Sequence, residues 1–172
     1  MRFVIRPADR ADLEDVRRIY NQGIADRSTL DREDKTASDI ATWYAAHDDR
    51  YAVLVAERDA LIAGWASLNR YSLRAAHRGV ADLSIYVDRA HRGHGVGSAL
   101  MQAIENRAVR GAFDKIVLMT FPFNRDGLML FGRHGYREIG IFENQGRLDG
   151  RLVDTLAMEK LLSPFPGDAD SG

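Results

Sequence analysis

The chain has 172 residues, which fits one domain of ordinary size. Its 45% hydrophobic and 28% charged residues are typical of a globular protein and exclude disordered, collagenous and fibrous classes. Basic and acidic side chains nearly cancel at a net charge of −1, so no overall positive field attracts nucleic acid or an anionic membrane. The absence of cysteine excludes disulfides, thiol nucleophiles and cysteine-ligated metals.

The sequence also lacks an apolar stretch suited to a signal peptide or to a membrane-spanning helix. We therefore expect a cytoplasmic protein. Among the 24 basic residues only three, at positions 35, 115 and 160, are lysine. Arginine recognises oxyanions in a bidentate manner, so this bias indicates anionic ligands.

The spacing of apolar residues predicts the elements of the first half of the chain. They are a strand at 3–5, a helix with apolar positions from 13 to 20, a helix opened by Ser38, and strands at 51–57, 61–69 and 79–87. The polar stretch 21–36 has no periodicity and predicts a loop that could lie over a pocket. Between the first two long strands, Arg58-Asp59-Ala60 predicts a hairpin turn.

The second half continues in the same alternating way. It predicts a helix from about 96 to 109, a strand at 115–120, a helix at 124–134, and strands at 136–144 and 151–160 joined by a turn-rich segment, 145–150. The order β α α β β β α β α β β predicts an α/β fold of the α+β type, with one mixed sheet flanked by helices. We expect a single domain over 1–162 and a flexible tail over 163–172, which is rich in Pro, Gly and Asp.

A glycine-rich loop carries the clearest chemical signal. Gly93, Gly95 and Gly97 lie between a buried strand and the start of a helix, where backbone N–H groups and the positive helix end can bind a phosphate. Arg92 can add positive charge. A dinucleotide fingerprint would need glycine where Ser98 stands, and a triphosphate-binding loop would need Gly-Lys-Ser or Gly-Lys-Thr. A glycine turn without a chemical role stays open as the alternative.

Together with the preceding strand, Asn124 and Gly135-Tyr136, the segment 92–97 resembles the GNAT superfamily of acyl-CoA-dependent N-acetyltransferases. The resemblance covers about residues 3–161. Segments 20–24, 74–86 and 145–151 are similar to the phosphinothricin, methionine sulfone and arsinothricin N-acetyltransferases of that superfamily.

This resemblance implies that acetyl-CoA is the cosubstrate, with its diphosphate on the loop amides and its pantetheine arm along the strand that precedes the loop. The amide near Val87 would polarise the thioester carbonyl. Asn124 would contact the cofactor, and a helix N-cap is an equally open interpretation of this residue. The implied cofactor-binding residues are Ile85, Tyr86, Val87, Arg92, Gly93, His94, Gly95, Val96, Gly97, Ser98, Asn124 and Phe131.

For catalysis the resemblance implies a carboxylate base, and the chain has Asp82 where relatives commonly have glutamate. Strand alternation places Asp82, Ser84 and Tyr86 on one face, so Asp82 and Tyr86 are the candidate catalytic residues. An ordinary aspartate is too acidic for efficient proton abstraction unless burial raises its pKa or a water relays the proton, and we expect the relay. The alternative is a structural ion pair of Asp82 with Arg74 or Arg78.

A second departure concerns the leaving thiolate. Phe131 stands where many relatives have a tyrosine that donates a proton. The thiolate must then leave unaided, or Tyr86 or water must assist.

Arg74 and Arg78, and more weakly Arg27, are the candidate residues for binding an anionic amino-acid substrate, although a solvated charged connection is equally open for the first two. The histidines have no metal-ligand spacing, and we expect no metal. We expect a small-molecule amine as partner and a homodimer formed through the last two strands. Acetylation of a protein N-terminus or lysine, or a CoA-binding module without catalysis, are the alternative functions.

Overall fold

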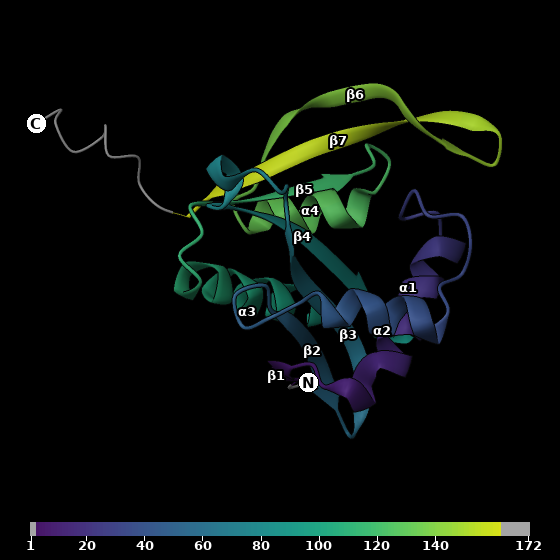
Figure 1. The fold of residues 1–172 in the computed structure, drawn as a ribbon. Helices are drawn as coiled ribbons and strands as arrows, with labels where there is room; N and C mark the ends of the chain where they lie inside the picture. Colours follow the sequence, from purple (N-terminus) through teal and green to yellow (C-terminus); the bar gives the residue numbers. More distant parts are fainter. Residues whose placement is uncertain (1–2, 163–172) are drawn as a thin grey trace, which may run out of the picture.

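The computed structural model describes residues 3–162, so the tail expected at 163–172 lies outside the described residues. Its strands and helices follow the predicted order β α α β β β α β α β β, which is confirmed (Figure 1). They are β1 (Val4–Pro7), α1 (Leu13–Ala25), α2 (Ala37–Ala45), β2 (Val53–Arg58), β3 (Leu61–Arg70), β4 (Val80–Val87), α3 (Val96–Arg110), β5 (Lys115–Thr120), α4 (Arg125–Arg133), β6 (Arg137–Leu148) and β7 (Arg151–Leu161). Short 3-10 turns occupy Arg10–Asp12, Ala75–His77 and Arg89–His91.

The strands form one seven-stranded sheet in the order β1-β2-β3-β4-β5-β7-β6. Neighbouring strands are antiparallel except β4 and β5, which are parallel and are connected through α3. The long β6–β7 hairpin forms one edge of the sheet (Figure 1). This mixed sheet confirms the predicted fold class.

Alternating side chains of the central strands separate two apolar layers. Leu54 and Ala56 of β2 pack with α3 and α4 on one face, whereas Val53 and Val55 pack with α1 and α2 on the other. Because the strand period is two, one strand supplies both cores. Trp65 belongs to the second core, which also includes the ring of Tyr86.

Three predicted boundaries are wrong for a physical reason. Helix α2 is not opened by Ser38, because Thr36 caps it by accepting from the Asp39 amide. Helix α1 continues to Ala25, past the predicted end near residue 20, because Gly23 and Ile24 are buried although their neighbours are polar. Strand β6 continues to Leu148, which is buried, so only Asp149 and Gly150 form the turn, at φ 48° and 79°. The turn predicted at Arg58-Asp59-Ala60 is confirmed for Asp59 and Ala60, both at positive φ, whereas Arg58 is the last residue of β2.

The feature that creates a site is the limited pairing of β4 with β5. Their register covers Val80–Asp82 against Lys115–Val117 and stops there, although β4 continues to Val87 and β5 to Thr120. On its other side β4 pairs with β3 from Ala81 to Val87. The outer half of β4 therefore has one backbone edge that no strand within residues 3–162 covers.

Gly64 of β3 is required where three elements meet. A Cβ there would lie 2.9 Å from the Tyr86 carbonyl oxygen and 3.1 Å from side-chain carbons of Val96 and Leu100. We expect Gly64→Ala to lower the free energy of unfolding by about 1–3 kcal/mol, because backbone and core atoms must move. Urea unfolding measures the change. Gly140→Ala in β6 is the control, because a Cβ there meets nothing within 4 Å, and equal stability of the two variants would contradict the close packing.

Candidate functional site

A cavity of about 760 Å³ lies where β4 and β5 separate. Its walls come from the outer half of β4, the end of β5, the glycine loop and α4. Among the predicted catalytic and cofactor residues, only His94 does not line it; Arg27, Arg74 and Arg78 do not line it either. The structure thus brings together most of the predicted site residues.

The uncovered edge of β4 presents backbone donors and acceptors to this cavity. The Asp88 amide donates to the Ala63 carbonyl of β3 at 2.9 Å, so residue 88 faces β3. Since successive residues of a strand point their N–H and C=O groups to opposite sides, those of Ile85 and Val87 face the gap. An extended molecule carrying amides could pair with them as an added strand would.

The glycine loop adds a second set of backbone donors. Gly93 and Gly95 have φ values of 74° and 85°, which only glycine adopts easily, and Gly95 is the N-cap of α3. The first amides of α3 have no partner within the helix and point toward its N-terminal end. This end of the helix lines the cavity. Gly97 differs from Gly93 and Gly95, because its φ is not positive. It is needed instead for close packing, since a Cβ there would lie 3.0 Å from Leu130.

The positive charge near the loop is partly neutralised. Arg92 and Arg89 both donate to the carboxylate of Asp26, Arg92 Nη2 at 2.8 Å and Arg89 Nη2 at 2.5 Å. The hydrogen bond from Arg89, with help from Arg92, lowers the pKa of Asp26. Ser98 Oγ, at the start of α3, lies 2.9 Å from His134 Nε2. The loop therefore presents oriented backbone amides to the cavity more than it presents net positive charge.

Asp82 lies where β4 and β5 part, with its side chain largely enclosed. Burial raises its pKa to about 6, and a hydrogen bond from Asn69, whose Nδ2 lies 3.4 Å from Asp82 Oδ2, offsets part of this rise. No ion pair joins Asp82 to Arg74 or Arg78 in the described residues, so the structural ion-pair alternative is wrong. Asn69 was not predicted, because only the pairing of β3 with β4 brings it opposite Asp82.

Tyr86 lines the same cavity, two alternations along β4. Its ring lies against those of Tyr20 and Trp65, with centroid distances of 4.9 and 5.0 Å. Burial raises the pKa of its phenol to about 12. The hydroxyl therefore stays protonated at neutral pH. Gly23 of α1 allows this packing, because a Cβ there would lie 2.8 Å from the Tyr86 ring.

Asn124 and Phe131 are both positioned by α4. Asn124 caps the helix, accepting from the Gly127 amide at 3.2 Å, and its Nδ2 donates to Thr120 Oγ1 at 3.0 Å. The N-cap interpretation of Asn124 is therefore confirmed, and the residue also lines the cavity. Phe131 is buried beside Tyr136, with ring centroids 6.1 Å apart.

The three arginines predicted to bind substrate lie elsewhere. Arg27 donates to Asp149 at 2.7 and 2.8 Å, which connects the loop after α1 to the β6–β7 turn. Arg74 is exposed and precedes the 3-10 turn Ala75–His77, and the exposed Arg78 ends that turn. Their role in binding stays a prediction.

Within residues 3–162, no cluster of three or more histidine or acidic side chains is arranged to hold a metal ion. None of the helices in the same part of the chain combines the length and hydropathy needed to cross a membrane.

Comparison with known proteins agrees with this geometry. The model of the Acetyltransferase (GNAT) family matches residues 13–136. YwnH of Bacillus subtilis, provisionally described as a phosphinothricin acetyltransferase, is 35% identical over 94% of this chain and all of its own length. The L-methionine sulfoximine/L-methionine sulfone acetyltransferase of Pseudomonas aeruginosa is 31% identical over 93% of this chain and 95% of its own.

A solved structure extends the likeness to the fold. The structure of yncA from Salmonella typhimurium, provisionally described as an acetyltransferase and determined with its cofactor acetyl-CoA, has a TM-score of 0.91 and 25% identity. It covers 95% of this chain and 96% of its own. The family match spans more than half of the chain. The separated strands β4 and β5 and the glycine loop both present backbone groups to the cavity. The chain belongs to the GNAT family and is an acetyl-CoA-dependent acyltransferase.

Proposed function

We propose that this chain transfers acetyl from acetyl-CoA to the α-amine of a small amino-acid analogue of the phosphinothricin or methionine sulfoximine/sulfone type, which would detoxify it. Relatives with these names match over nearly the full length of both chains. The observation that carries the proposal is the enclosed carboxylate of Asp82 beside the uncovered edge of β4. An arsinothricin-type substrate rests on the sequence resemblance alone.

The residues of the cavity fit the proposed cosubstrate. The amides from Gly93 to Ser98 would hold its diphosphate, and the free edge at Ile85 and Val87 would pair with its amide-containing arm. Asn124 and Phe131, on α4, would form the opposite wall. When bound, acetyl-CoA supplies an activated thioester. The Val87 N–H would donate to the thioester oxygen as negative charge develops there, a kind of contact whose removal costs about 2.7–4 kcal/mol.

Asp82 would accept the proton that the attacking amine must lose. A carboxylate with a pKa of about 6 is a better base at neutral pH than an ordinary aspartate, whose pKa is 3.8. The expectation of a water relay assumed the ordinary value. Burial raises the pKa of Asp82, which removes the need for a relay, so Asp82 can act directly or through one water.

Neither Phe131 nor Tyr86 is suited to protonate the leaving thiolate. Phe131 has no proton to give, and the phenol of Tyr86, with a pKa of about 12, is a weaker acid than a thiol with a pKa of about 8.5. We therefore propose that neither residue acts as the acid in this step, and that Tyr86 shapes the cavity wall.

The homodimer stays a proposal, supported by the exposed Ile139, Ile141 and Phe142 on the edge strand β6.

A thiol-release assay with acetyl-CoA tests the substrate class. We expect release with phosphinothricin, methionine sulfoximine or methionine sulfone, and little with peptide N-termini or lysine. Asp82→Asn should lower kcat by roughly 10²–10⁴-fold while acetyl-CoA still binds. If Arg74 and Arg78 bind substrate, glutamine at either position raises KM for the anionic amines selectively.

Other outcomes of this assay identify the alternatives. Release with peptides alone would establish a protein acetyltransferase. Calorimetric binding of acetyl-CoA with no release from any amine would establish a binding module. Either result overturns the proposal.

The same carboxylate should limit the stability of the unliganded protein. Because the folded pKa of Asp82 is raised above 3.8, the stability it contributes is fully present below about pH 4 and is lost as the pH rises through about 6. Asp82→Asn should therefore gain stability relative to the natural chain between pH 4 and pH 8, by about 1–3 kcal/mol. Urea unfolding at both pH values measures this. Asp34→Asn, an exposed loop variant, is the control, and a pH-independent difference for Asp82→Asn would contradict the burial argument.

Phe131→Tyr tests the thiolate step. If departure needs no acid, a phenol at this position changes kcat only modestly. A gain above about tenfold, equivalent to about 1.4 kcal/mol, would show that proton donation limits the rate. Phe131→Leu, which removes the ring without adding a donor, separates the effect of packing from that of the hydroxyl.

A further inference from the structure

Asp26 is the C-cap residue of α1, where a carboxylate is electrostatically unfavourable because the negative end of the helix lies there. Its backbone N–H donates to the Gln22 carbonyl oxygen at 2.9 Å, which fixes the cap. Asp26 lines the Asp82 cavity, as Arg92 does. An acid at this position does not help the helix, so we looked for its role among the groups that it contacts.

Arg89 alone is a sufficient counter-ion for the Asp26 carboxylate. Arg89 Nε lies 3.1 Å from each carboxylate oxygen, and its Nη2 lies 2.5 Å from Oδ1. Gln22 holds Arg89 in place, because its Oε1 accepts from the Arg89 backbone N–H at 3.0 Å and its carbonyl oxygen accepts from Arg89 Nη2 at 3.3 Å. The hydrogen bond from Arg89 is also the main cause of the lowered pKa of Asp26. Asp26 therefore does not need Arg92 to stay ionised and paired.

Arg92 is nevertheless held at two points. Its Nη2 donates to Asp26 Oδ2 at 2.8 Å, and its Nε donates to the Val87 carbonyl oxygen at 3.2 Å. Both acceptors are fixed, Asp26 by the cap and by Arg89, and Val87 by the pairing of β4 with β3. The Val87 carbonyl keeps a second lone pair for another donor. Moving Arg92 toward a ligand would break both hydrogen bonds.

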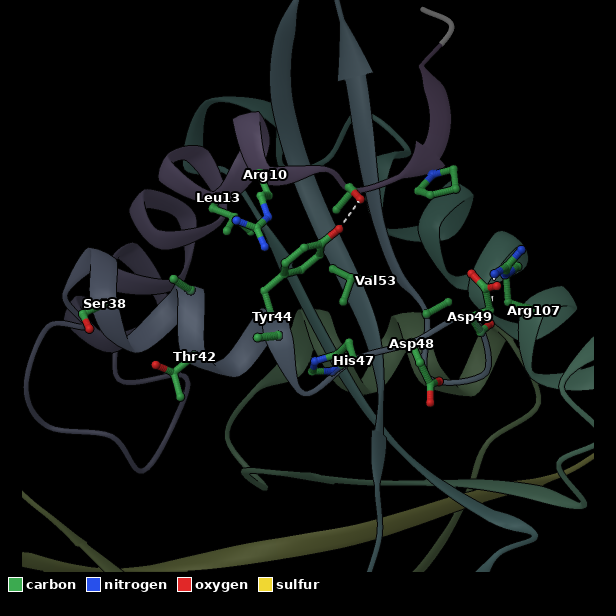
Figure 2. A pocket seen from close by; sticks show the side chains of 15 residues that line it. Arg10, Leu13, Ser38, Thr42, Tyr44, His47, Asp48, Asp49, Val53 and Arg107 are labelled. Atoms are coloured by element: carbon green, nitrogen blue, oxygen red, sulfur yellow. Dashed lines mark hydrogen bonds between the residues drawn. The ribbon is translucent and has the colours of Figure 1, made fainter.

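Few cations face this cavity. Among the described residues, Arg92 and Arg133 are the only arginines that line it, and no lysine does. A second cavity, of about 740 Å³, lies between α2, the start of β2 and the first 3-10 turn (Figure 2). The arginines of that cavity, Arg10 and Arg107, do not line the Asp82 cavity. The contact with Asp26 thus restrains one of two arginines available to an anionic ligand at the glycine loop.

We infer that Asp26 is a positioning residue that keeps the Arg92 guanidinium away from the diphosphate of the cosubstrate. Acetyl-CoA and CoA then both bind less tightly than the loop would otherwise allow. Arginine forms strong, charge-assisted hydrogen bonds to phosphate, so withholding it lowers the affinity. The inference rests on the proposed binding of the diphosphate by the amides of Gly93 to Ser98, and does not depend on which amine is acetylated.

Calorimetric titration with acetyl-CoA, and separately with CoA, tests this role. Asp26→Asn keeps the shape of the side chain but removes the charge that holds Arg92. We expect both ligands to bind this variant more tightly by about tenfold or more, the usual effect of a gained hydrogen bond to a charged group. The gain should be equal for the two ligands because they share the diphosphate. If Asp26 only supports the loop, the variant binds more weakly or unchanged, which overturns the inference.

Arg92→Gln identifies the residue through which Asp26 acts. On its own this change should alter the dissociation constant by less than about threefold, because the guanidinium is engaged elsewhere and only its charge is lost. In Asp26→Asn/Arg92→Gln the gain of the single Asp26 variant should disappear. A loss of about tenfold or more in Arg92→Gln alone would show that Arg92 already contacts the diphosphate, and would overturn the inference.

Asp126→Asn is the matched control for charge. Asp126 lies in the first turn of α4 and lines the same cavity, and its carboxylate is not paired with Arg92. Removing any negative charge near a bound anion strengthens binding, here by less than about threefold across water. An Asp26→Asn gain no larger than that of Asp126→Asn, or one that persists in the double variant, would reduce the effect of Asp26 to its charge alone and overturn the inference.

The salt dependence of the same titrations gives an independent readout. A released guanidinium adds an ionic contact, and potassium chloride screens such contacts. The affinity of Asp26→Asn for acetyl-CoA should therefore fall more steeply with salt than that of the natural chain, and parallel slopes contradict the inference. If the natural chain binds acetyl-CoA but Asp26→Asn does not differ from it, only the inference fails. If the natural chain does not bind acetyl-CoA, the proposed function fails as well.

Discussion

The separation of β5 from β4 beyond the Asp82–Val117 pair is the constraint on which the rest of the site depends. A strand in the middle of a sheet normally satisfies its backbone groups on both sides, and leaving them unpaired away from water is unfavourable. In this chain β3 holds one side of β4 along its outer half, while the other side faces the cavity. The cosubstrate of a GNAT enzyme carries amides along its arm, so the uncovered edge of β4 would serve as its binding surface under the proposed function. The α3 crossover that makes β4 and β5 parallel also delivers the glycine loop to the same gap.

The second constraint is electrostatic. Asp82 is placed where burial raises its pKa, and no cation contacts it directly among the described residues. An arginine beside it would favour the carboxylate but would also make it a poorer base. A neutral amide is a compromise, because it orients the carboxylate without removing its basicity. The site thus accepts a loss of stability in exchange for a group that titrates near neutral pH.

Much of the fold follows from local patterns. The element order, the place of the glycine loop between a strand and a helix, and the common face of Asp82 and Tyr86 all depend on residues close together in the sequence, and local spacing predicted them. The end of α1 depends instead on the burial of Gly23 against Tyr86, which local polarity conceals.

The register between strands could not be predicted from the sequence, because it also depends on contacts between distant residues. The point where β4 leaves β5, and the meeting of Asn69 and Asp82, arise from pairing between distant segments. No spacing along the chain encodes these contacts. The alternative interpretation, an ion pair of Asp82 with Arg74 or Arg78, failed because Asp82 faces the cavity, whereas Arg74 and Arg78 lie in the exposed connection before β4.

The shared counter-ion Asp26 has a consequence for turnover. With two guanidinium groups held by one carboxylate, the loop presents mainly dipoles to a ligand, and dipolar contacts weaken less with ionic strength than bare charges do. The diphosphate is common to acetyl-CoA and to the CoA that remains after transfer. If the loop holds this shared part as proposed, it would bind both equally, and accumulated CoA would compete with acetyl-CoA for the next cycle.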